Sequence, residues 1–190
     1  NVELSKELAK KISYLPQNPE IPAGMTVGQI LEFGRHPHRG LFSSLSKEDR
    51  DIISYVAGEF ELEGLLSTEL KNLSGGQRQR VWLAMTIIQD TEVILLDEPT
   101  SALDIGHQID VLESIRKIVF ERKKTVVIVI HDLNMASKYC DHIIALDKGW
   151  VVSEGKTKDV LDVDLIANLF EANMMSMEHP KGGASFFVPN

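Results

Sequence analysis

Two runs, NLSGGQRQR over residues 72–80 and VILLDEPTSALD over residues 93–104, indicate the fold and chemistry of this chain. The first places a Ser-Gly-Gly turn before a helical segment, and backbone amides at such a turn bind anions such as phosphate. The second is an apolar strand ending in Asp97 and Glu98, carboxylates that suit a metal ion and a general base. Because the two runs occur in this order with one helix between them, they predict a nucleotide-hydrolysing protein.

Each of these features also has an ordinary structural explanation. A bare Ser-Gly-Gly is more often a simple helix cap, and two acids often do no more than end a strand. Their combination favours the phosphate and metal interpretation. His131 ends the most apolar strand of the chain and can bond a terminal phosphate, although a lone histidine there is more often structural. Gln17 follows Tyr-Leu-Pro in a loop, from which it can reach a metal-bound water.

The composition narrows the function classes. The 190 residues are 43% apolar and 25% charged, as in an ordinary soluble globular protein. A formal charge of −8 argues against a nucleic-acid surface, which needs a basic field. The single Cys140 predicts a reducing compartment. No signal peptide is expected in these residues, and no apolar run approaches the roughly 20 residues that span a bilayer. The start at Asn1, without an initiator methionine, predicts a fragment of a longer protein.

Local signals organise the chain up to residue 72. Thr26 with Gln29 is a capping box, which predicts a helix to about Phe33. Ser46 is expected to cap a second helix, because acidic residues occupy the first turn that would follow it. The other expected segments are a helix over residues 6–11 capped by Ser5, a strand over 12–15 and a loop over 16–24.

From residue 73 helical and strand patterns alternate, which predicts right-handed crossovers and a mostly parallel sheet. Residues 125–130 are all β-branched and are expected to form a fully buried parallel strand. Lys148 and Gly149 predict a tight hairpin turn. The remaining expected segments are helices over about 77–89, 105–122, 132–139, 157–161 and 163–171, and strands over 92–96, 142–146 and 150–153.

Taken together, these motifs resemble the ATP-binding subunit of ABC transporters over essentially the whole chain. Residues 73–77 are similar to the signature motif, 93–98 to the Walker B strand with its catalytic glutamate, and 101–104 to the D-loop. His131 resembles the switch histidine and Gln17 the Q-loop glutamine. The runs Met-Thr-Val at 25–27, Gly-Arg-His-Pro-His at 34–38 and Phe-Phe-Val-Pro at 186–189 resemble importers of iron chelates, haem and cobalamin.

The resemblance implies an α/β fold of the P-loop NTPase (RecA-like) type, with a mostly parallel sheet and a helical subdomain. It also implies N-terminal truncation, because the family's GxxxxGK[ST] run is absent from these residues. The expected division is residues 1–24 as a remnant of the ATP-binding core with the Q-loop, 25–72 as the helical subdomain, 73–155 as the catalytic core and 156–190 as C-terminal helices and tail.

The implied cofactors are ATP and Mg²⁺. Glu98 and His131 would be catalytic, with Glu98 orienting the attacking water and His131 contacting the γ-phosphate. Asp97 would bind the metal and Gln17 would sense it. The residues implied to contact nucleotide, some of them on a partner's nucleotide, are Gln17, Ser74, Gly75, Gly76, Gln77 and Asp104.

The implied partners are a second copy of the subunit in a head-to-tail homodimer and an integral-membrane permease, with a periplasmic or lipoprotein solute-binding protein engaged indirectly and no nucleic acid. The chain would be peripheral, on the cytoplasmic face of the plasma membrane. Without the Walker A loop it is expected to hydrolyse ATP poorly or not at all alone. Two alternatives remain open: a non-transport ABC ATPase, and a non-catalytic dimerisation module that supplies LSGGQ in trans.

Overall fold

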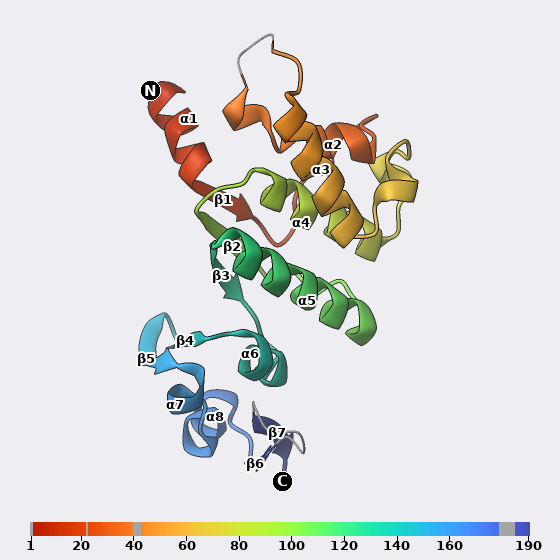
Figure 1. Cartoon of the computed structure of the whole chain (residues 1–190). Helices are drawn as coiled ribbons and strands as arrows, with labels where there is room; N and C mark the ends of the chain where they lie inside the picture. The colour runs from red at the N-terminus through yellow and green to blue at the C-terminus, as the bar shows by residue number, and fades with distance from the viewer. Residues whose placement is uncertain (1, 22, 40–42, 179–184) are drawn as a thin grey trace. The chain divides into compact units, whose positions relative to one another are not determined.

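A computed structural model of the chain describes residues 2–21, 23–39, 43–178 and 185–190 (Figure 1). The chain forms two compact units, Asn1–Val129 and Ile130–Asn190. Among the described residues, the first unit contains the parallel sheet and most of the helices, and the second contains two antiparallel strand pairs with three short helices.

A parallel three-stranded sheet organises the first unit. Its strands are β1 (Ile12–Leu15), β2 (Val93–Asp97) and β3 (Thr125–Val129), in the order β1-β2-β3. The central strand β2 ends at Asp97, which pairs with Val129 of β3. The carboxyl ends of the three strands therefore meet at one edge, where ligands of parallel sheets collect.

Helices α4 (Gly75–Ile88) and α5 (Ile105–Arg122) flank β2 in the sequence. Helix α4 is buried on most sides, with Val81, Leu83 and Ala84 inaccessible to solvent. Helix α5 packs mainly through Val111, Leu112, Ile115 and Ile118. Both helices contribute to one continuous hydrophobic core with the buried face of the sheet.

The segment between β1 and α4 is helical, and Figure 1 shows α2 and α3 beside α4. Both expected caps are present, because Thr26 with Gln29 and Ser46 with Asp49 form capping boxes. The helical elements of the first unit outside α4 and α5 are α1 (Val2–Lys11), α2 (Val27–Phe33), η1 (His36–His38), α3 (Lys47–Glu59), η2 (Glu63–Leu65) and η3 (Leu70–Asn72).

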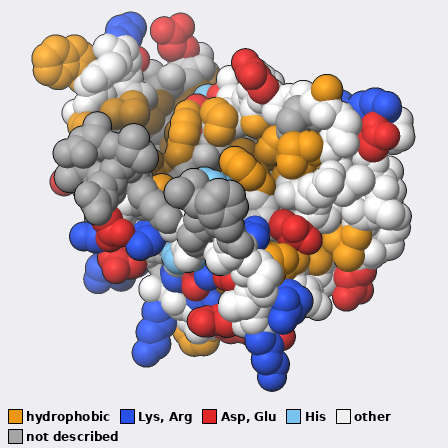
Figure 2. Space-filling model, turned by 90° about the horizontal axis from the view of Figure 1, so that it is seen from above, with side chains coloured by type: hydrophobic (Ala, Val, Ile, Leu, Met, Phe, Trp, Pro, Cys, Tyr) orange, Lys and Arg blue, Asp and Glu red, His pale blue; other side chains and the backbone are white. Residues whose placement is uncertain are grey.

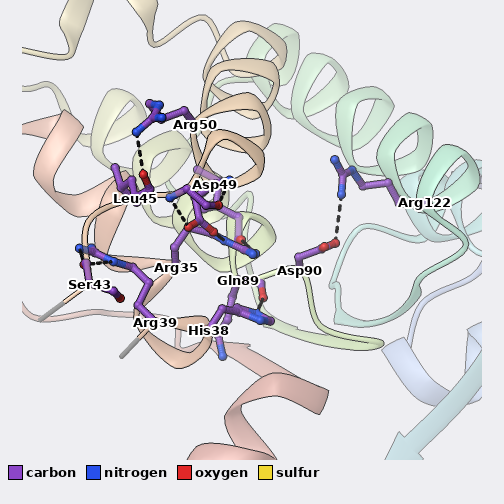
Figure 3. A network of polar contacts seen from close by, with 12 residues as sticks. Arg35, His38, Arg39, Ser43, Leu45, Asp49, Arg50, Gln89, Asp90 and Arg122 are labelled. Carbon is purple, nitrogen blue, oxygen red and sulfur yellow. Dashed lines mark hydrogen bonds and ion pairs between the residues drawn. The ribbon is translucent and has the colours of Figure 1, made fainter. Parts of the chain in front are cut away.

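A buried ion pair lies within this helical segment, and its arginine also reaches α4 (Figure 3). Nε of Arg35 lies 2.7 Å from Oδ1 of Asp49, the N3 residue of the α3 capping box. The same guanidinium donates to the carbonyl of Ile88 at 3.0 Å. One arginine therefore ties the start of α3 to the last turn of α4.

The second unit contains a hairpin of β4 (His142–Asp147) and β5 (Trp150–Lys156). The expected turn is confirmed, since Lys148 has φ 47° and Gly149 has φ 84°, the backbone of a tight two-residue turn. A second antiparallel hairpin joins β6 and β7. The other elements are α6 (Leu133–Tyr139), α7 (Thr157–Val160), α8 (Val163–Phe170), β6 (Met174–Glu178) and β7 (Ser185–Pro189).

Three local expectations were wrong. Helix α1 begins at Val2, so Ser5 lies inside it rather than capping it. Helix α4 begins at Gly75 instead of 77, because Ser74 caps it and both glycines adopt helical geometry. Strand β3 ends at Val129 and is not fully buried: Val127 is 52% exposed. It lies at the edge of the described sheet, and alternate side chains point away from the core.

The surface mixes both signs of charge with exposed apolar side chains. On the face drawn in Figure 2, Lys and Arg side chains are interspersed with Asp and Glu, and hydrophobic side chains also reach the surface. Within the described ranges, none of the helices combines the length and apolar character that crossing a membrane requires.

Candidate functional site

The end of β2 places two carboxylates beside the loop that follows β1. Asp97 and Glu98 are both partly buried. The side-chain amide of Gln17 donates to Oε2 of Glu98 at 2.8 Å, and the hydroxyl of Tyr14 donates to Oδ2 of Asp97 at 3.5 Å. Parallel pairing of β1 with β2 explains this proximity, because both strands deliver their next residues to the same edge.

Glu98 has an unusual backbone. Its φ is 47°, in the left-handed region that costs a residue with a Cβ about 1–2 kcal/mol. The carbonyl of Glu98 accepts from the hydroxyl of Ser101 at 3.0 Å and from its amide at 3.3 Å. This turn moves the chain sharply off the sheet and holds the Glu98 side chain near Gln17, and strain of this kind is typical of functional sites.

Two glutamines hold the loop between β2 and α5. Gln79, on α4 and 6% exposed, donates to the carbonyl of Pro99 at 2.9 Å. Gln108, on α5, donates to the carbonyls of Thr100 at 3.2 Å and Leu103 at 3.0 Å. The loop's polar backbone is thus satisfied by side chains from both flanking helices, which fixes its conformation.

The glycine turn forms the start of α4. Ser74 is the N-cap, and its hydroxyl accepts from the amide of Gln77 while the Gln77 side chain accepts from the amide of Ser74. Gly75 and Gly76 are the first two helical residues, whose N–H groups have no acceptor within the helix. A Cβ at Gly76 would lie 3.0 Å from Leu103, whereas one at Gly75 would meet nothing within 4 Å. Gly76 therefore permits close packing against the loop, and Gly75 leaves the turn open to a ligand.

A hollow of about 330 Å³ separates this turn from the loop before α5. Asp104, the N-cap of α5, lies at its edge and accepts from the amide of His107 at 3.0 Å and from Nδ1 of His107 at 2.8 Å. These two hydrogen bonds lower the pKa of Asp104 and keep its carboxylate charged. The lining residues are Ser74, Gly76, Gln77, Arg80, Ala102, Leu103, Asp104 and His107.

His131 belongs to the second unit and is exposed. It immediately precedes Asp132, the N-cap of α6, whose Oδ1 accepts from the amides of Asn134 at 2.8 Å and Met135 at 2.9 Å. The structure thus brings Gln17, the β2 carboxylates and the glycine turn into one unit and places His131 in the other.

Sequence reasoning assigned no role to several residues at this site. Gln79 lies within the run at residues 72–80, but its buried hydrogen bond to Pro99 reaches a segment 20 positions further along the chain. Tyr14 precedes Gln17, and strand alternation could have placed it on the same side as Asp97. His107 stands three residues after Asp104, a spacing typical of a capping contact.

The oxygen donors at the end of β2 match the chemistry of magnesium. Asp97, Glu98 and the amide oxygen of Gln17 are hard ligands of the kind Mg²⁺ prefers, usually with several retained waters. No group of three or more His, Cys, Asp or Glu side chains suited to a metal is found in the part of the chain that the structure describes. Mg²⁺ is commonly held by one or two carboxylates together with substrate phosphates, and Asp97 and Glu98 are carboxylates of that kind.

Comparison with known families gives a match to the family described as ABC transporter over residues 2–101. A probable siderophore transport system ATP-binding protein of Bacillus subtilis, YusV, is 38% identical over 98% of this chain and 68% of its own length. The ferric enterobactin transport ATP-binding protein FepC of Escherichia coli is 40% identical over 97% of this chain and 68% of its own length. The chain thus spans about two thirds of these relatives.

Solved structures agree in fold. An inward-facing transporter described as of the metal-chelate ABC type superposes with a TM-score of 0.83 and 29% identity, over 95% of this chain and 72% of that one. The ATP-binding cassette MJ0796, in a dimeric post-hydrolysis state with ADP and phosphate, gives a TM-score of 0.71 and 32% identity, over 83% of this chain and 67% of that one. The three-stranded sheet and its helices therefore correspond to the P-loop NTPase-like fold of these cassettes.

Proposed function

Because the chain belongs to the ABC transporter family, we propose that it is the ATP-binding subunit of an importer for iron–siderophore, haem or cobalamin-type solutes. The relatives named for siderophore and ferric enterobactin transport support the importer class. The observation that carries the proposal is the end of β2, where Gln17 bonds Glu98 beside Asp97. The proposed reaction is hydrolysis of ATP, whose energy drives transport.

In this proposal Glu98 polarises the attacking water as general base, and Gln17 holds its carboxylate in place. Asp97, with Gln17 nearby, would hold Mg²⁺, which would neutralise charge on the phosphates when bound. The left-handed backbone at Glu98 and the fixed loop after it keep this carboxylate preorganised. His131 would contact the γ-phosphate.

Ser74, Gly75, Gly76 and Gln77, together with Asp104, would act on the nucleotide held by a second copy of the chain. The open amides of the turn and the adjoining hollow support phosphate binding there. A head-to-tail homodimer places two such sites symmetrically. The dimeric structure of the cassette MJ0796 supports the same arrangement here.

The proposed division of the chain keeps residues 1–24 and 73–155 as the ATP-binding core, 25–72 as the helical subdomain and 156–190 as the C-terminal part. A membrane permease would dock on the helical subdomain near residues 17–40, on the cytoplasmic face of the membrane. A second hollow of about 330 Å³ supports this placement, since Gly28 and Glu32 of α2 and Arg50 of α3 line it. The solute-binding protein would be engaged only through the permease.

Hydrolysis by these residues alone is expected to be poor. No GxxxxGK[ST] run occurs among the 190 residues, and each preorganised donor of a phosphate cradle is worth about 10²–10³ in rate. The test compares phosphate release by this chain with release by the product of the reading frame extended upstream of Asn1. The extended protein should turn over at about 1 s⁻¹ or faster and this chain far more slowly.

The matched variant is Glu98→Gln in the extended protein, which keeps the hydrogen-bonding shape but removes the base. We expect turnover to fall by about 10²–10⁴ while ATP binding persists. Unchanged turnover in this variant would remove the basis for the proposed site. Turnover near 1 s⁻¹ by the 190-residue chain itself would contradict the proposed need for a separate phosphate loop.

Direct tests distinguish the proposed importer subunit from two other functions. A non-transport ABC ATPase would hydrolyse ATP but would not copurify with a membrane permease, so permease capture from solubilised membranes distinguishes it. A non-catalytic module that offers only LSGGQ in trans would have no upstream phosphate loop, and reading the upstream frame decides this. The presence of both Glu98 and His131 favours the catalytic subunit.

A further inference from the structure

The C-terminal strand β7 is hydrogen-bonded to the helix that follows His131. The side-chain amide of Asn134 donates to the carbonyl of Phe187 at 3.2 Å, and the amide of Phe187 donates to Oδ1 of Asn134 at 2.8 Å. The hydroxyl of Ser137, one turn further along α6, donates to the carbonyl of Ser185 at 2.9 Å. Asn134 thus pairs with a peptide of β7 as a neighbouring strand would.

The same asparagine belongs to the cap of α6. Its backbone amide donates to Oδ1 of Asp132 at 2.8 Å, and Asp132 is covalently joined to His131. Two hydrogen bonds therefore form a continuous path from the Phe187 peptide through Asn134 to Asp132, the residue next to His131. Every member of this path lies within the second unit.

Helix α6 needs such an anchor. It has seven residues, too few for a helix to be stable by itself in water. Ala136 is its only fully buried residue in the described structure, so apolar burial contributes little. Phe187, in contrast, is 3% exposed and gives β7 a fixed position against which α6 can be held.

We propose that Asn134 is a positioning residue, which pairs with the Phe187 peptide and thereby fixes the first turn of α6 and the orientation of His131. The C-terminal hairpin then serves the switch histidine rather than only closing the fold. The importance of His131 for hydrolysis rests on the proposed function, but the physical linkage between Phe187 and His131 does not.

The test is made on the 190-residue chain without nucleotide. Asn134→Leu keeps the size of the side chain and removes both hydrogen bonds to Phe187. Ser137→Ala is the matched control, because it removes a bond to the same strand one turn farther from His131. The readouts are the NMR signal of the His131 ring, assigned with His131→Gln, and hydrogen exchange of the Phe187 amide.

We expect Asn134→Leu to move the His131 signal and to speed exchange of the Phe187 amide by about fivefold or more, as loss of one net hydrogen bond does. Ser137→Ala should leave the His131 signal in place. Asn134→Asp keeps the acceptor for the Phe187 amide but loses the donor, so it should give an intermediate shift, and it serves if Asn134→Leu does not fold.

Three results would overturn the proposal: an unmoved His131 signal in both Asn134 variants, unchanged Phe187 exchange, or an equal shift in Ser137→Ala. Because no nucleotide is used, these results are independent of the ATPase measurements. An inactive extended protein with a shifted His131 signal would count against the proposed function alone, and the reverse outcome would count against the positioning role alone.

Discussion

The buried pair of Arg35 and Asp49 should be the most sensitive electrostatic point in the first unit. Their side chains are 8% and 9% exposed, and the charged atoms are 2.7 Å apart. Burial raises the pKa of Asp49, but hydrogen bonds from Arg35 and Ser46 outweigh burial and lower that pKa to about 2. Asp49→Asn leaves the guanidinium buried opposite a neutral amide, and breaking one side of such a pair costs about 3–5 kcal/mol.

The effect should depend on pH in a defined direction. The pKa of Asp49 falls from 3.8 to about 2 on folding, which corresponds to about 2 kcal/mol of stability. Since the folded-state pKa is the lower one, this contribution is complete above about pH 4 and is lost as the pH falls through 2. The difference between wild type and Asp49→Asn should therefore shrink by about 2 kcal/mol between pH 4 and pH 2.

Urea unfolding monitored by tryptophan fluorescence measures this difference. Trp82 lies on α4, the helix that Arg35 contacts through Ile88, so the experiment uses a Trp150→Phe background in which Trp82 alone reports. Asp51→Asn is the matched control, because Asp51 is an exposed residue of the same helix and should change stability by no more than about 0.5 kcal/mol. A loss below about 1 kcal/mol for Asp49→Asn at pH 7, or a difference that stays constant down to pH 2, would refute the reasoning.

Three further predictions concern the first unit. Gly34→Ala places a Cβ 2.6 Å from a backbone oxygen of α4, so it should lower the unfolding free energy by about 1–3 kcal/mol. Gly64→Ala, with open space around that position, should not lower it. Thermal melts of both variants measure the difference. Burial and a neighbouring carboxylate raise the pKa of Tyr55 to about 12, so stability that is complete below about pH 10 is lost as the pH rises toward 12. Absorbance titration of the phenols should show a late component that Tyr55→Phe removes. Gln79→Met leaves a buried loop carbonyl without its donor and should cost about 1–3 kcal/mol in urea unfolding; an unchanged midpoint would contradict this.

Features set by neighbouring residues could be predicted from the sequence. The capping boxes at Thr26 and Ser46 and the turn at Lys148 require only residues within a few positions of each other, and all three are present. Strand β1 was predicted at its observed bounds, because Pro16 cannot continue it. The start of α4 was misplaced because glycine disfavours a helix interior but not its first turn, where Ser74 completes the cap.

Features set by distant partners could not be predicted. The β-branched run that forms β3 is compatible with either one or two covered faces, and only the sheet order shows that Val127 faces outward. The pairing of Asn134 with Phe187 joins segments 53 positions apart. A polar side chain in such a sequence has many possible partners, so its role appears only when the chain has folded.

In the proposed dimer, the loop between β2 and α5 would connect two nucleotide sites. Its carbonyls are held by Gln79 from the helix that begins with the glycine turn and by Gln108 from the helix that Asp104 caps. Gln79 thus ties Pro99, the residue after Glu98, to α4, and Gly76 packs directly against Leu103 at the other end of the loop. If Glu98 acts on the chain's own nucleotide and the glycine turn on that of a second copy, the same hydrogen bonds transmit the state of one nucleotide to the other. The linkage then requires no hinge between these elements, because a rigid loop that moves as one piece shifts both surfaces together.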